Sequence, residues 1–291
     1  MNGVTVCITA RNAEGTIAGS VRSALRALPP SGRVLVRDDG STDGTAAAVA
    51  RIGDRRLRIL DDASPQGIPA SRNALLEQVE TPFVAILDGD DRAFPWRFSR
   101  QARLLAGGAD LAFSTVIVRK PPIPLLKPQL LPFLSSEGIA LALLLENPLM
   151  HPTLTGRTSV MRALDGYRSV AAEDFDLYLR ASLEGHRLVR DTVPTVLYLR
   201  HAHQTTIDPD WIRSKTASTL VEEAFDDLGR RLLGFAPGWF SWRRAGFPRG
   251  GAPEGLETEL RALLDAAAGL RPSEQRHLAG LVSFFRGKAA A

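Results

Sequence analysis

The stretch Val84-Ala85-Ile86-Leu87-Asp88-Gly89-Asp90-Asp91 begins as an apolar run and stops at three acidic residues. A run of this length is typical of a buried strand, so the strand would deliver a carboxylate cluster to one edge of a sheet, where open α/β folds bind their ligands. Neighbouring carboxylates repel one another unless a cation lies among them, and their hard oxygen atoms suit Mg²⁺ or Mn²⁺ held together with a substrate phosphate. The alternative is an acidic turn in solvent, and the rest of the sequence has to decide between the two.

The composition is that of an ordinary soluble globular enzyme, with 291 residues of which 44% are hydrophobic and 23% charged. The net charge of +4 favours an anionic partner such as a nucleotide, a phospholipid surface or nucleic acid, without selecting among them. Cys7 is the only cysteine, which excludes a disulfide framework and a thiolate metal site. The start of the sequence does not resemble a signal peptide, and the apolar run at 139–145 is too short to span a bilayer, so we expect a cytoplasmic protein.

Strands and helices alternate in the first part of the chain. Apolar, β-rich runs at 4–9, 33–37 and 57–60 are each followed by a segment with helical spacing of apolar residues. The second run ends on Asp38 and Asp39, so acidic residues follow two of the strands. This order predicts an α/β fold with a mostly parallel central sheet, helices on both faces and a nucleotide-sized ligand over the carboxyl ends of the strands.

The later sequence departs from this alternation. It predicts a strand at 110–118, a proline- and leucine-rich loop with little secondary structure at 119–132, and helices at 139–146 and 173–185. From residue 207 onward only helical patterns remain, at 211–233 and from about residues 254 and 273. We therefore expect a helical C-terminal appendage on the α/β domain.

Six blocks of sequence carry a resemblance to a known family. They are Thr9-Ala10-Arg11-Asn12, Arg37-Asp38-Asp39-Gly40-Ser41-Thr42-Asp43-Gly44, Gly67 with Ser71-Arg72-Asn73, Leu87-Asp88-Gly89-Asp90-Asp91, Asn147-Pro148 with His151-Pro152-Thr153, and Glu173-Asp174-Phe175-Asp176-Leu177. In this order and at these spacings they resemble the inverting GT-A fold glycosyltransferases of family two, which depend on nucleotide sugars. The resemblance implies a GT-A catalytic domain at 1–206, with nucleotide-sugar binding at about 1–118 and the acceptor side at about 119–206, followed by a helical region at 207–291.

Asp38 and Asp39 can accept hydrogen bonds from a base and from ribose hydroxyls, because an ionised carboxylate is only an acceptor. The resemblance assigns this block to the base of the nucleotide, whereas capping of the following helix is the alternative. Calcium binding in an EF-hand loop is excluded, because Ala50 stands where a bidentate Glu is needed. The resemblance adds further donor-binding residues, namely Thr9, Arg11, Arg72, Asp88 and Gly89.

Arg72 follows Gly67 by about one helical turn, so its guanidinium and the exposed N–H groups of the helix can both face an anion. The resemblance puts this arginine over the nucleotide. An ion pair on a helix surface is the alternative.

The resemblance puts Asp90 on the metal, Mg²⁺ or Mn²⁺, and Asp88 near the ribose, with Asp91 as either an alternative metal ligand or a residue that supports the ligands from behind. The chemistry needs a cation because departure of a nucleoside diphosphate leaves negative charge on its β-phosphate. His201 matches the position of a family histidine that completes the metal sphere. His203 stands where the family more commonly has a small residue, so which of the two histidines turns toward the metal stays open.

Glu173 and Asp174 open a helix, where the positive end of the dipole favours ionised carboxylates. Attack of a sugar hydroxyl needs a proton acceptor within hydrogen-bond reach, and the resemblance assigns that role to Asp174, with Glu173 as its neighbour in the catalytic block. Ordinary first-turn acids are the alternative. We expect His151 and Thr153 on the acceptor side.

Together these residues imply a metal-dependent inverting glycosyltransferase that moves a sugar from a UDP-sugar to a sugar or a lipid-linked sugar, in bacterial polysaccharide or glycoconjugate synthesis. A sugar nucleotidyltransferase is one rival, disfavoured because the segment after the first strand holds one glycine and no lysine for a triphosphate. A non-catalytic nucleotide-sugar-binding partner is the other, and the intact acidic residues argue against it.

Arginines and aromatic residues interleave between Asp227 and Glu254, a stretch without acidic residues. Arginines with exposed tryptophans suit the headgroup layer of an anionic membrane, so peripheral contact at the inner face of the membrane is one interpretation. Packing of the aromatic rings inside the helical region is the other. Nucleic-acid binding is not expected, because the sequence holds no motif for it.

Overall fold

The computed structural model describes residues 3–62, 64–120, 125–200 and 218–290. Contacts within the chain divide it into two compact units, each made of three segments. We call residues 1–131, 149–169 and 190–201 the sheet unit, and residues 132–148, 170–189 and 202–291 the helical unit. The expected boundary near residue 206 stays a prediction.

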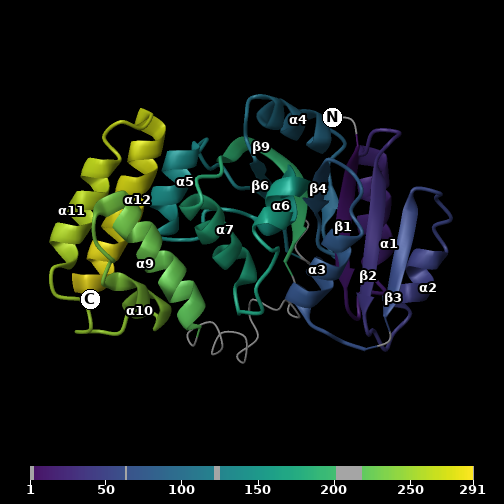
Figure 1. Ribbon diagram of the computed structural model, residues 1–291, viewed down its shortest axis with the longest axis horizontal. Coiled ribbons are helices and arrows are strands. Elements are labelled where there is room, and N and C mark those ends of the chain that lie inside the picture. Colours follow the sequence, from purple (N-terminus) through teal and green to yellow (C-terminus); the bar gives the residue numbers. More distant parts are fainter. Residues whose placement is uncertain (1–2, 63, 121–124, 201–217, 291) are drawn as a thin grey trace. The chain divides into compact units, whose positions relative to one another are not determined.

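The sheet unit is built on a sheet to which the described residues contribute nine strands, in the order β3-β2-β1-β4-β8-β6-β9-β5 with β7 paired to β6. In its first half, the strands β1 (Val4–Ala10), β2 (Arg33–Asp39), β3 (Leu57–Asp62) and β4 (Phe83–Ile86) run parallel to one another (Figure 1). Strand β1 is paired on both edges, and nearly all of its side chains are buried. The predicted alternation of strands and helices is confirmed here.

Three helices connect these strands and bury their apolar faces. Helix α1 (Ile17–Ala27) packs with β1 in one apolar core, in which Ile17 and Val21 join Val6 and Ile8. Helix α2 (Thr45–Ala50) begins beside Asp43, whose carboxylate accepts a hydrogen bond from the Thr45 N–H at 3.0 Å. Helix α3 (Ile68–Glu77) carries a proline in its first turn, where the missing N–H removes no helical hydrogen bond.

Beyond β4 the sheet changes direction. Strand β8 (Thr155–Arg157) is antiparallel to both β4 and β6 (Leu111–Arg119), and β5 (Arg92–Ala93) is antiparallel to β9 (Leu188–Leu199). The segment at 119–132, where little secondary structure was expected, contains the three-residue strand β7 (Leu126–Pro128), which pairs with β6. Helix α4 (Arg97–Ala106), a 3-10 turn at His151–Thr153 and helix α6 (Thr158–Ala163) complete the described part of this unit.

The helical unit contains α5 (Ser136–Leu143), α7 (Glu173–Leu183), α9 (Thr219–Leu233), α10 (Trp239–Arg244), α11 (Leu256–Ala266) and α12 (Pro272–Ala290) among its described residues. Polar contacts join its separate segments. The buried carboxylate of Glu274 accepts a hydrogen bond from the Ser135 N–H at 2.6 Å, and Trp239 Nε1 donates to the carbonyl of Leu144 at 2.6 Å. The C-terminal helices therefore share one core with α5 and α7.

Helix α10 corrects the interpretation of the stretch after Asp227. Trp239, Phe240 and Trp242 are buried, and Phe240 packs on Phe225 with the ring centroids 4.4 Å apart. The guanidinium of Arg243 lies 5.3 Å from the ring centroid of Phe175 in α7. The expectation of exposed tryptophans in this stretch is wrong, because α10 turns these rings into the core of the helical unit.

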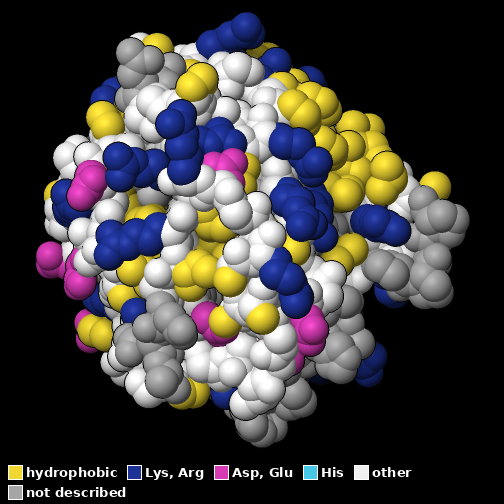
Figure 2. Space-filling model, turned by 90° about the vertical axis from the view of Figure 1, so that its right-hand side faces the viewer, with side chains coloured by type: hydrophobic (Ala, Val, Ile, Leu, Met, Phe, Trp, Pro, Cys, Tyr) yellow, Lys and Arg dark blue, Asp and Glu magenta, His cyan; other side chains and the backbone are white. Residues whose placement is uncertain are grey.

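No helix in the described ranges combines the length and the hydrophobicity needed to cross a bilayer. The face shown in Figure 2 carries many Lys and Arg side chains and few acidic ones, with hydrophobic side chains gathered beside them. This distribution agrees with the positive formal charge of the chain.

Candidate active site

The acidic turn, Asp88 to Asp91, follows the carboxyl end of β4. Asp88, Asp90 and Asp91 each offer a carboxylate oxygen within 4.8 Å of the others. The turn closes through a hydrogen bond from the Asp91 N–H to the Asp88 carbonyl at 3.2 Å, and the hydroxyl of Ser20 donates to the same carbonyl at 2.9 Å. The sequence prediction that β4 delivers three carboxylates to one edge of the sheet is met by this geometry.

Asp91 is the buried member of the turn. Its Oδ1 accepts a hydrogen bond from the Leu199 N–H of β9 at 2.8 Å, whereas its buried Oδ2 has no hydrogen-bond partner among the described residues. Burial raises the pKa of Asp91 well above its ordinary value, and the charges of Asp88 and Asp90 raise it further. A divalent cation would relieve this repulsion, and three carboxylates with one unsatisfied oxygen form a hard donor set that fits Mg²⁺ or Mn²⁺.

Arg97, which the sequence analysis did not single out, fixes the strand that carries the acidic turn. Its Nη2 donates to the carbonyls of Ile86 and Leu154, at 2.7 and 3.0 Å, where β4 and the chain before β8 separate. The Ile86 N–H also donates to the Leu154 carbonyl at 2.9 Å, so Arg97 lies at the end of the backbone pairing between β4 and β8. Complete burial lowers the pKa of Arg97 to about 9, against the raising effect of Asp91 and Asp88.

Gln101 extends this buried contact toward the His151–Thr153 turn. Its Oε1 accepts hydrogen bonds from Arg97 Nε at 3.2 Å and from the Thr155 hydroxyl at 2.6 Å, and its Nε2 donates to the Thr153 carbonyl. We call Arg97 and Gln101 the buried clamp. The sequence holds a signal for it, since two polar residues four positions apart share the buried face of α4 with Phe98 and Leu105.

The second acidic pair lies at the carboxyl end of β2. Asp38 Oδ1 accepts hydrogen bonds from the N–H and the hydroxyl of Ser41, at 3.0 and 2.5 Å. Asp39 accepts from the N–H groups of Gln66 and Gly67, at 2.8 and 3.0 Å, and from the hydroxyl of Ser71 at 2.7 Å. Burial opposes ionisation of Asp39, but these hydrogen bonds outweigh it and lower the pKa. Much of the acceptor capacity of both carboxylates is thus already used within the chain.

The loop after β1 contacts the loop after β2 and lies near the acidic turn. Asn12 has a left-handed backbone, with φ of 51°, and its side-chain oxygen accepts from the Thr42 N–H at 2.9 Å. Gly89 lies so close to the end of β1 that a Cβ there would come within 3.3 Å of the Thr9 carbonyl. Thr9, Gly89 and the acidic turn are therefore neighbours, and Arg11 lies exposed in the loop between Thr9 and Asn12.

Arg72 is buried and connects the acidic turn to the acceptor-side candidates. Its Nη2 lies 3.4 Å from Asp88 Oδ1, and its guanidinium lies 5.4 Å from the ring centroid of Tyr167. The hydroxyl of Tyr167 is 3.1 Å from Nε2 of His151. Burial lowers the pKa of His151 well below its ordinary value, and the nearby charge of Arg72 lowers it further. Tyr167 was missed by the sequence analysis, which gave it no role.

Asn73 and Thr153 hold this part of the sheet unit together. The amide of Asn73 donates to the Tyr167 carbonyl at 2.7 Å and accepts from the Tyr167 N–H at 2.8 Å. Thr153 is fully buried, and its hydroxyl donates to the Met150 carbonyl at 2.7 Å. The structure thus gives the Thr153 side chain an internal partner, although an acceptor-side role was expected for it.

The helical unit holds the candidate base. Helix α7 begins after Ala172, whose left-handed backbone, with φ of 62°, turns the chain into the helix. Asp174 Oδ2 accepts a hydrogen bond from Asn147 Nδ2 at 3.1 Å, and Glu173 is buried beside it. Asn147 therefore orients the Asp174 carboxylate within this unit. His201 and His203 lie outside the described residues.

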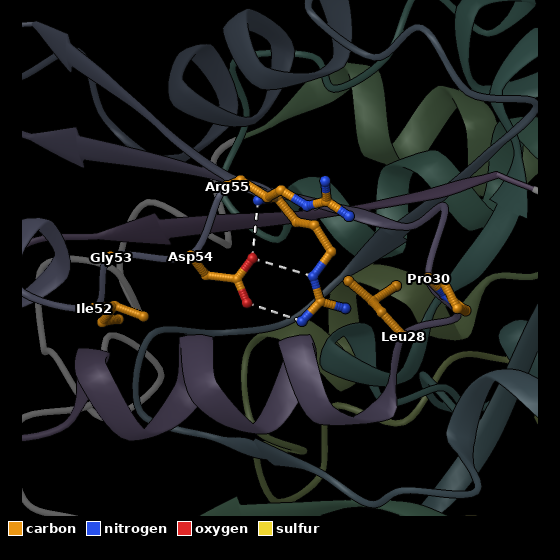
Figure 3. Close-up of a pocket in the computed structure, with 7 residues that line it drawn as sticks. Leu28, Pro30, Ile52, Gly53, Asp54 and Arg55 are labelled. Carbon is orange, nitrogen blue, oxygen red and sulfur yellow. Dashed lines mark hydrogen bonds and ion pairs between the residues drawn. The ribbon is translucent and has the colours of Figure 1, made fainter.

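A surface depression of 690 Å³ is lined by Leu28, Pro30 and residues 52–56 (Figure 3). Its lining precedes β2 and β3, so it lies at the amino ends of these two strands, whereas Asp38 and Asp39 lie at the carboxyl end of β2. Within it, Asp54 and Arg56 form an ion pair with 2.9 Å between Oδ2 and Nη2. The depression is therefore separate from Asp38 and Asp39.

Comparison with known proteins gives a consistent result. The model of the family described as "Glycosyl transferase family 2" matches residues 5–165. The chain is 32% identical over 199 residues to "Putative glycosyltransferase EpsE" of Bacillus subtilis (strain 168), covering 63% of this chain and 68% of that protein. It is 34% identical over 88 residues to "UDP-Glc:alpha-D-GlcNAc-diphosphoundecaprenol beta-1,3-glucosyltransferase WfgD" of Escherichia coli, covering 30% of this chain and 35% of that protein.

Among solved structures, the chain is similar to "S. aureus TarS 1-349 in complex with UDP-GlcNAc", with a TM-score of 0.67 and 19% identity over 99% of this chain and 88% of that chain. This likeness shows the fold and confirms the predicted GT-A architecture with C-terminal helices. The family match extends over more than half of the chain, and the similarity to EpsE covers about two thirds of that protein. The chain therefore belongs to glycosyl transferase family 2, and it is a glycosyltransferase.

Proposed function

We propose that the protein transfers a sugar from a UDP-sugar to an acceptor hydroxyl with inversion, and that Mg²⁺ or Mn²⁺ at the acidic turn assists the transfer. The observation that carries the proposal is the cluster of three carboxylates after β4, in which burial, and then the charges of Asp88 and Asp90, raise the pKa of Asp91. Such a cluster is unfavourable without a cation. When bound there, the cation would stabilise the negative charge that develops on the β-phosphate of the leaving diphosphate.

In this proposal Asp90 and Asp91 hold the cation, with His201 as a further ligand. Asp88 is near enough to Arg72 to share the ribose and diphosphate side of the donor with it. Asp38 and Asp39, with Thr9, Arg11 and Gly89, form the remaining donor contacts. Asp39 contributes mainly by holding the Gln66–Gly67 loop against β2, since three of its hydrogen bonds go there and to Ser71.

Asp174 is the proposed base. It would take the proton from the acceptor hydroxyl as that oxygen attacks the anomeric carbon opposite the departing diphosphate. Asn147 fixes its orientation through the 3.1 Å hydrogen bond, and Glu173 adds negative charge to the same first turn of α7. His151 remains a proposed acceptor-side residue, and burial keeps its ring neutral.

The donor and acceptor classes are supported by the names of similar proteins. WfgD is named for UDP-Glc and a diphosphoundecaprenol acceptor, and the TarS structure holds UDP-GlcNAc. Other relatives are named for succinoglycan and teichoic acid synthesis. We therefore propose a lipid-linked sugar as the acceptor, synthesis of a bacterial polysaccharide or glycoconjugate as the process, and the cytoplasmic surface of a membrane as the place.

The test is turnover of a panel of UDP-sugars by the purified chain, with Mn²⁺, with Mg²⁺ and with EDTA. We expect UDP release that EDTA abolishes and that Asp90→Ala abolishes even at saturating Mn²⁺, because the variant loses a charged ligand. Calorimetry with UDP should show that Mn²⁺-dependent binding is lost as well.

The matched control is Asp54→Ala, which removes a carboxylate at the amino ends of the strands. It should keep both turnover and UDP binding. Wild-type activity in Asp90→Ala would contradict the metal assignment, and absence of turnover with every UDP-sugar would contradict the donor class.

A further inference from the structure

Exposed leucines gather in one short segment of the sheet unit. Six large hydrophobic side chains are exposed among the described residues, and three of them are Leu125, Leu126 and Leu130, with 69%, 51% and 89% of their surface exposed. All three belong to the returning arm of the β6–β7 hairpin or to the residues directly after it. Leucine gains from leaving water, so three exposed leucines within six residues indicate a surface that is covered in use.

The same segment is basic. Arg119, Lys120 and Lys127 are exposed, and the sequence from Leu111 to Ser136 contains no acidic residue. In the hairpin register Arg119 is opposite Leu126, and Val118 is opposite Lys127. Each of these two opposed pairs thus combines a basic and an apolar side chain. A partner that complements both kinds of side chain has a negatively charged surface with an apolar layer beneath it.

Strand β7 is poorly suited to pairing with another protein strand. Among the described residues it pairs only with β6, so its other edge is at the border of the sheet. That edge contains Lys127 and Pro128, and a charged side chain and a residue without an N–H are the two features that protect edge strands from adding a further strand. A lipid surface, which needs no backbone hydrogen bonds, does not meet this obstacle.

We propose that the lipid-facing hairpin, which we define as Arg119, Lys120 and Leu125 to Leu130, docks the protein on an anionic membrane surface. The leucines would enter the boundary of the acyl chains while the basic side chains remain among the headgroups. The inference rests on the proposed function, since it names the surface through which a transferase with a lipid-linked acceptor contacts the membrane. This surface takes the place of the stretch after Asp227 as the candidate membrane contact, because Trp239, Phe240 and Trp242 of that stretch are buried.

The experiment is co-sedimentation of the full chain with vesicles of phosphatidylcholine alone and of phosphatidylcholine with an equal amount of phosphatidylglycerol. We expect binding to the anionic vesicles that weakens as salt is added, and much weaker binding to the neutral ones. The double variants Lys120→Glu with Lys127→Glu, and Leu126→Ser with Leu130→Ser, should each bind anionic vesicles about tenfold more weakly or worse.

Two controls match these variants in kind. Arg55→Glu with Arg58→Glu makes the same change of charge at exposed positions elsewhere on the sheet unit, and Phe284→Ser removes an exposed hydrophobic side chain from the helical unit. Both should bind like the wild type. Equal loss in the controls, equal binding to neutral vesicles, or no binding to anionic vesicles at low salt would overturn the proposal.

Two further measurements separate this inference from its alternatives. Hydrolysis of a UDP-sugar in the absence of lipid should be unchanged in the hairpin variants, so a failure of the proposed activity would be seen independently of vesicle binding. Sedimentation of the free protein tests the other occupant of this surface. A dimer that Leu126→Ser with Leu130→Ser dissociates would show that a second copy covers the hairpin, and would overturn the lipid assignment.

Discussion

Asp174 offers the sharpest test of a single side chain. Asp174→Asn keeps the shape of the residue and can still bond to Asn147, but an amide cannot take the proton of an acceptor hydroxyl. We expect kcat of transfer to fall by roughly 10²-fold or more while UDP binding is retained. Steady-state kinetics and calorimetry measure the two effects separately.

Asp227→Asn, on an exposed acid of α9 that pairs with Arg230, is the control and should leave kcat unchanged. If UDP binding were lost together with transfer in Asp174→Asn, the residue would have a role in binding or folding instead of proton transfer.

His151 makes a second prediction, on stability. Its native pKa lies below the ordinary value of 6.5, so the unfolded chain takes up a proton at this residue before the native protein does. The native state is therefore favoured above pH 6.5 and loses up to about 1.4 kcal/mol per pH unit as the pH falls from 6.5 toward the native pKa.

Urea unfolding of the wild type and of His151→Gln at pH 7.5, 6.5 and 5.5 measures this difference. The free energy of unfolding should fall less steeply with acid in the variant. Parallel pH dependence in the two proteins would show that His151 is not the group responsible.

Residue by residue, the sequence predicted the carboxylates better than their partners. Asp88, Asp90 and Asp91 follow directly from a strand that ends in acids. Tyr167 could not be predicted to stack on Arg72, because the two residues are far apart in the chain and only the folded sheet unit brings them together. The hydrogen bonds that Asp39 accepts from Gln66 and Gly67 could not be predicted for the same reason.

At the scale of elements, the buried clamp predicts how β4 depends on α4. Arg97→Met fills similar space but removes the donor to the Ile86 carbonyl, whereas the Leu154 carbonyl keeps its hydrogen bond from the Ile86 N–H. One unsatisfied buried carbonyl costs about 1–3 kcal/mol, so we expect the free energy of unfolding to fall by about that amount. We also expect UDP binding with Mn²⁺ to weaken even at a temperature where the variant is folded.

Arg100→Met, one turn away on a partly exposed side of α4 where Arg100 pairs with Asp191, is the matched control. It should change stability by about 1 kcal/mol or less and leave UDP binding intact. Normal UDP binding in folded Arg97→Met would mean that the clamp stabilises the fold without positioning the acidic turn.

The strands and helices of the first half were predictable because their apolar residues recur with the spacing of a strand or of a helix. Strand β9 was missed, since Arg190, Asp191 and Pro194 interrupt the alternation that marks a strand. In the fold, the carbonyl of Pro194 accepts a hydrogen bond from Trp96 Nε1 at 2.8 Å. Helix α10 was missed because prolines and glycines surround its six residues.

At the scale of the whole molecule, the shared core of the helical unit predicts that the helices after residue 206 are needed for α5 and α7 to fold. A chain ending at residue 206 would lose α9, which packs on α7, and α12, which packs on α5. It would also lose the hydrogen bond from Trp239 to Leu144 and the one that Glu274 accepts from Ser135. We expect this fragment to aggregate, because the apolar faces of α5 and α7 would be exposed.

Size-exclusion chromatography and near-ultraviolet circular dichroism would compare this fragment with a control chain ending at Lys288, which loses only exposed residues of α12. The control should elute and absorb like the full chain. A monomeric fragment of residues 1–206 with native dichroism would contradict the shared core of the helical unit.

The order of the strands along the chain also governs what happens while the protein is being made. Strand β4 lies between β1 and β8 in the sheet, yet β8 begins only at Thr155. At about 5–20 residues per second, the ribosome needs about 3–14 seconds to travel from Ile86 to Thr155. During this interval the edge of β4 that later pairs with β8 keeps its backbone N–H and C=O groups unpaired. The nascent chain therefore offers this edge to chaperones or to other nascent chains on the same messenger RNA.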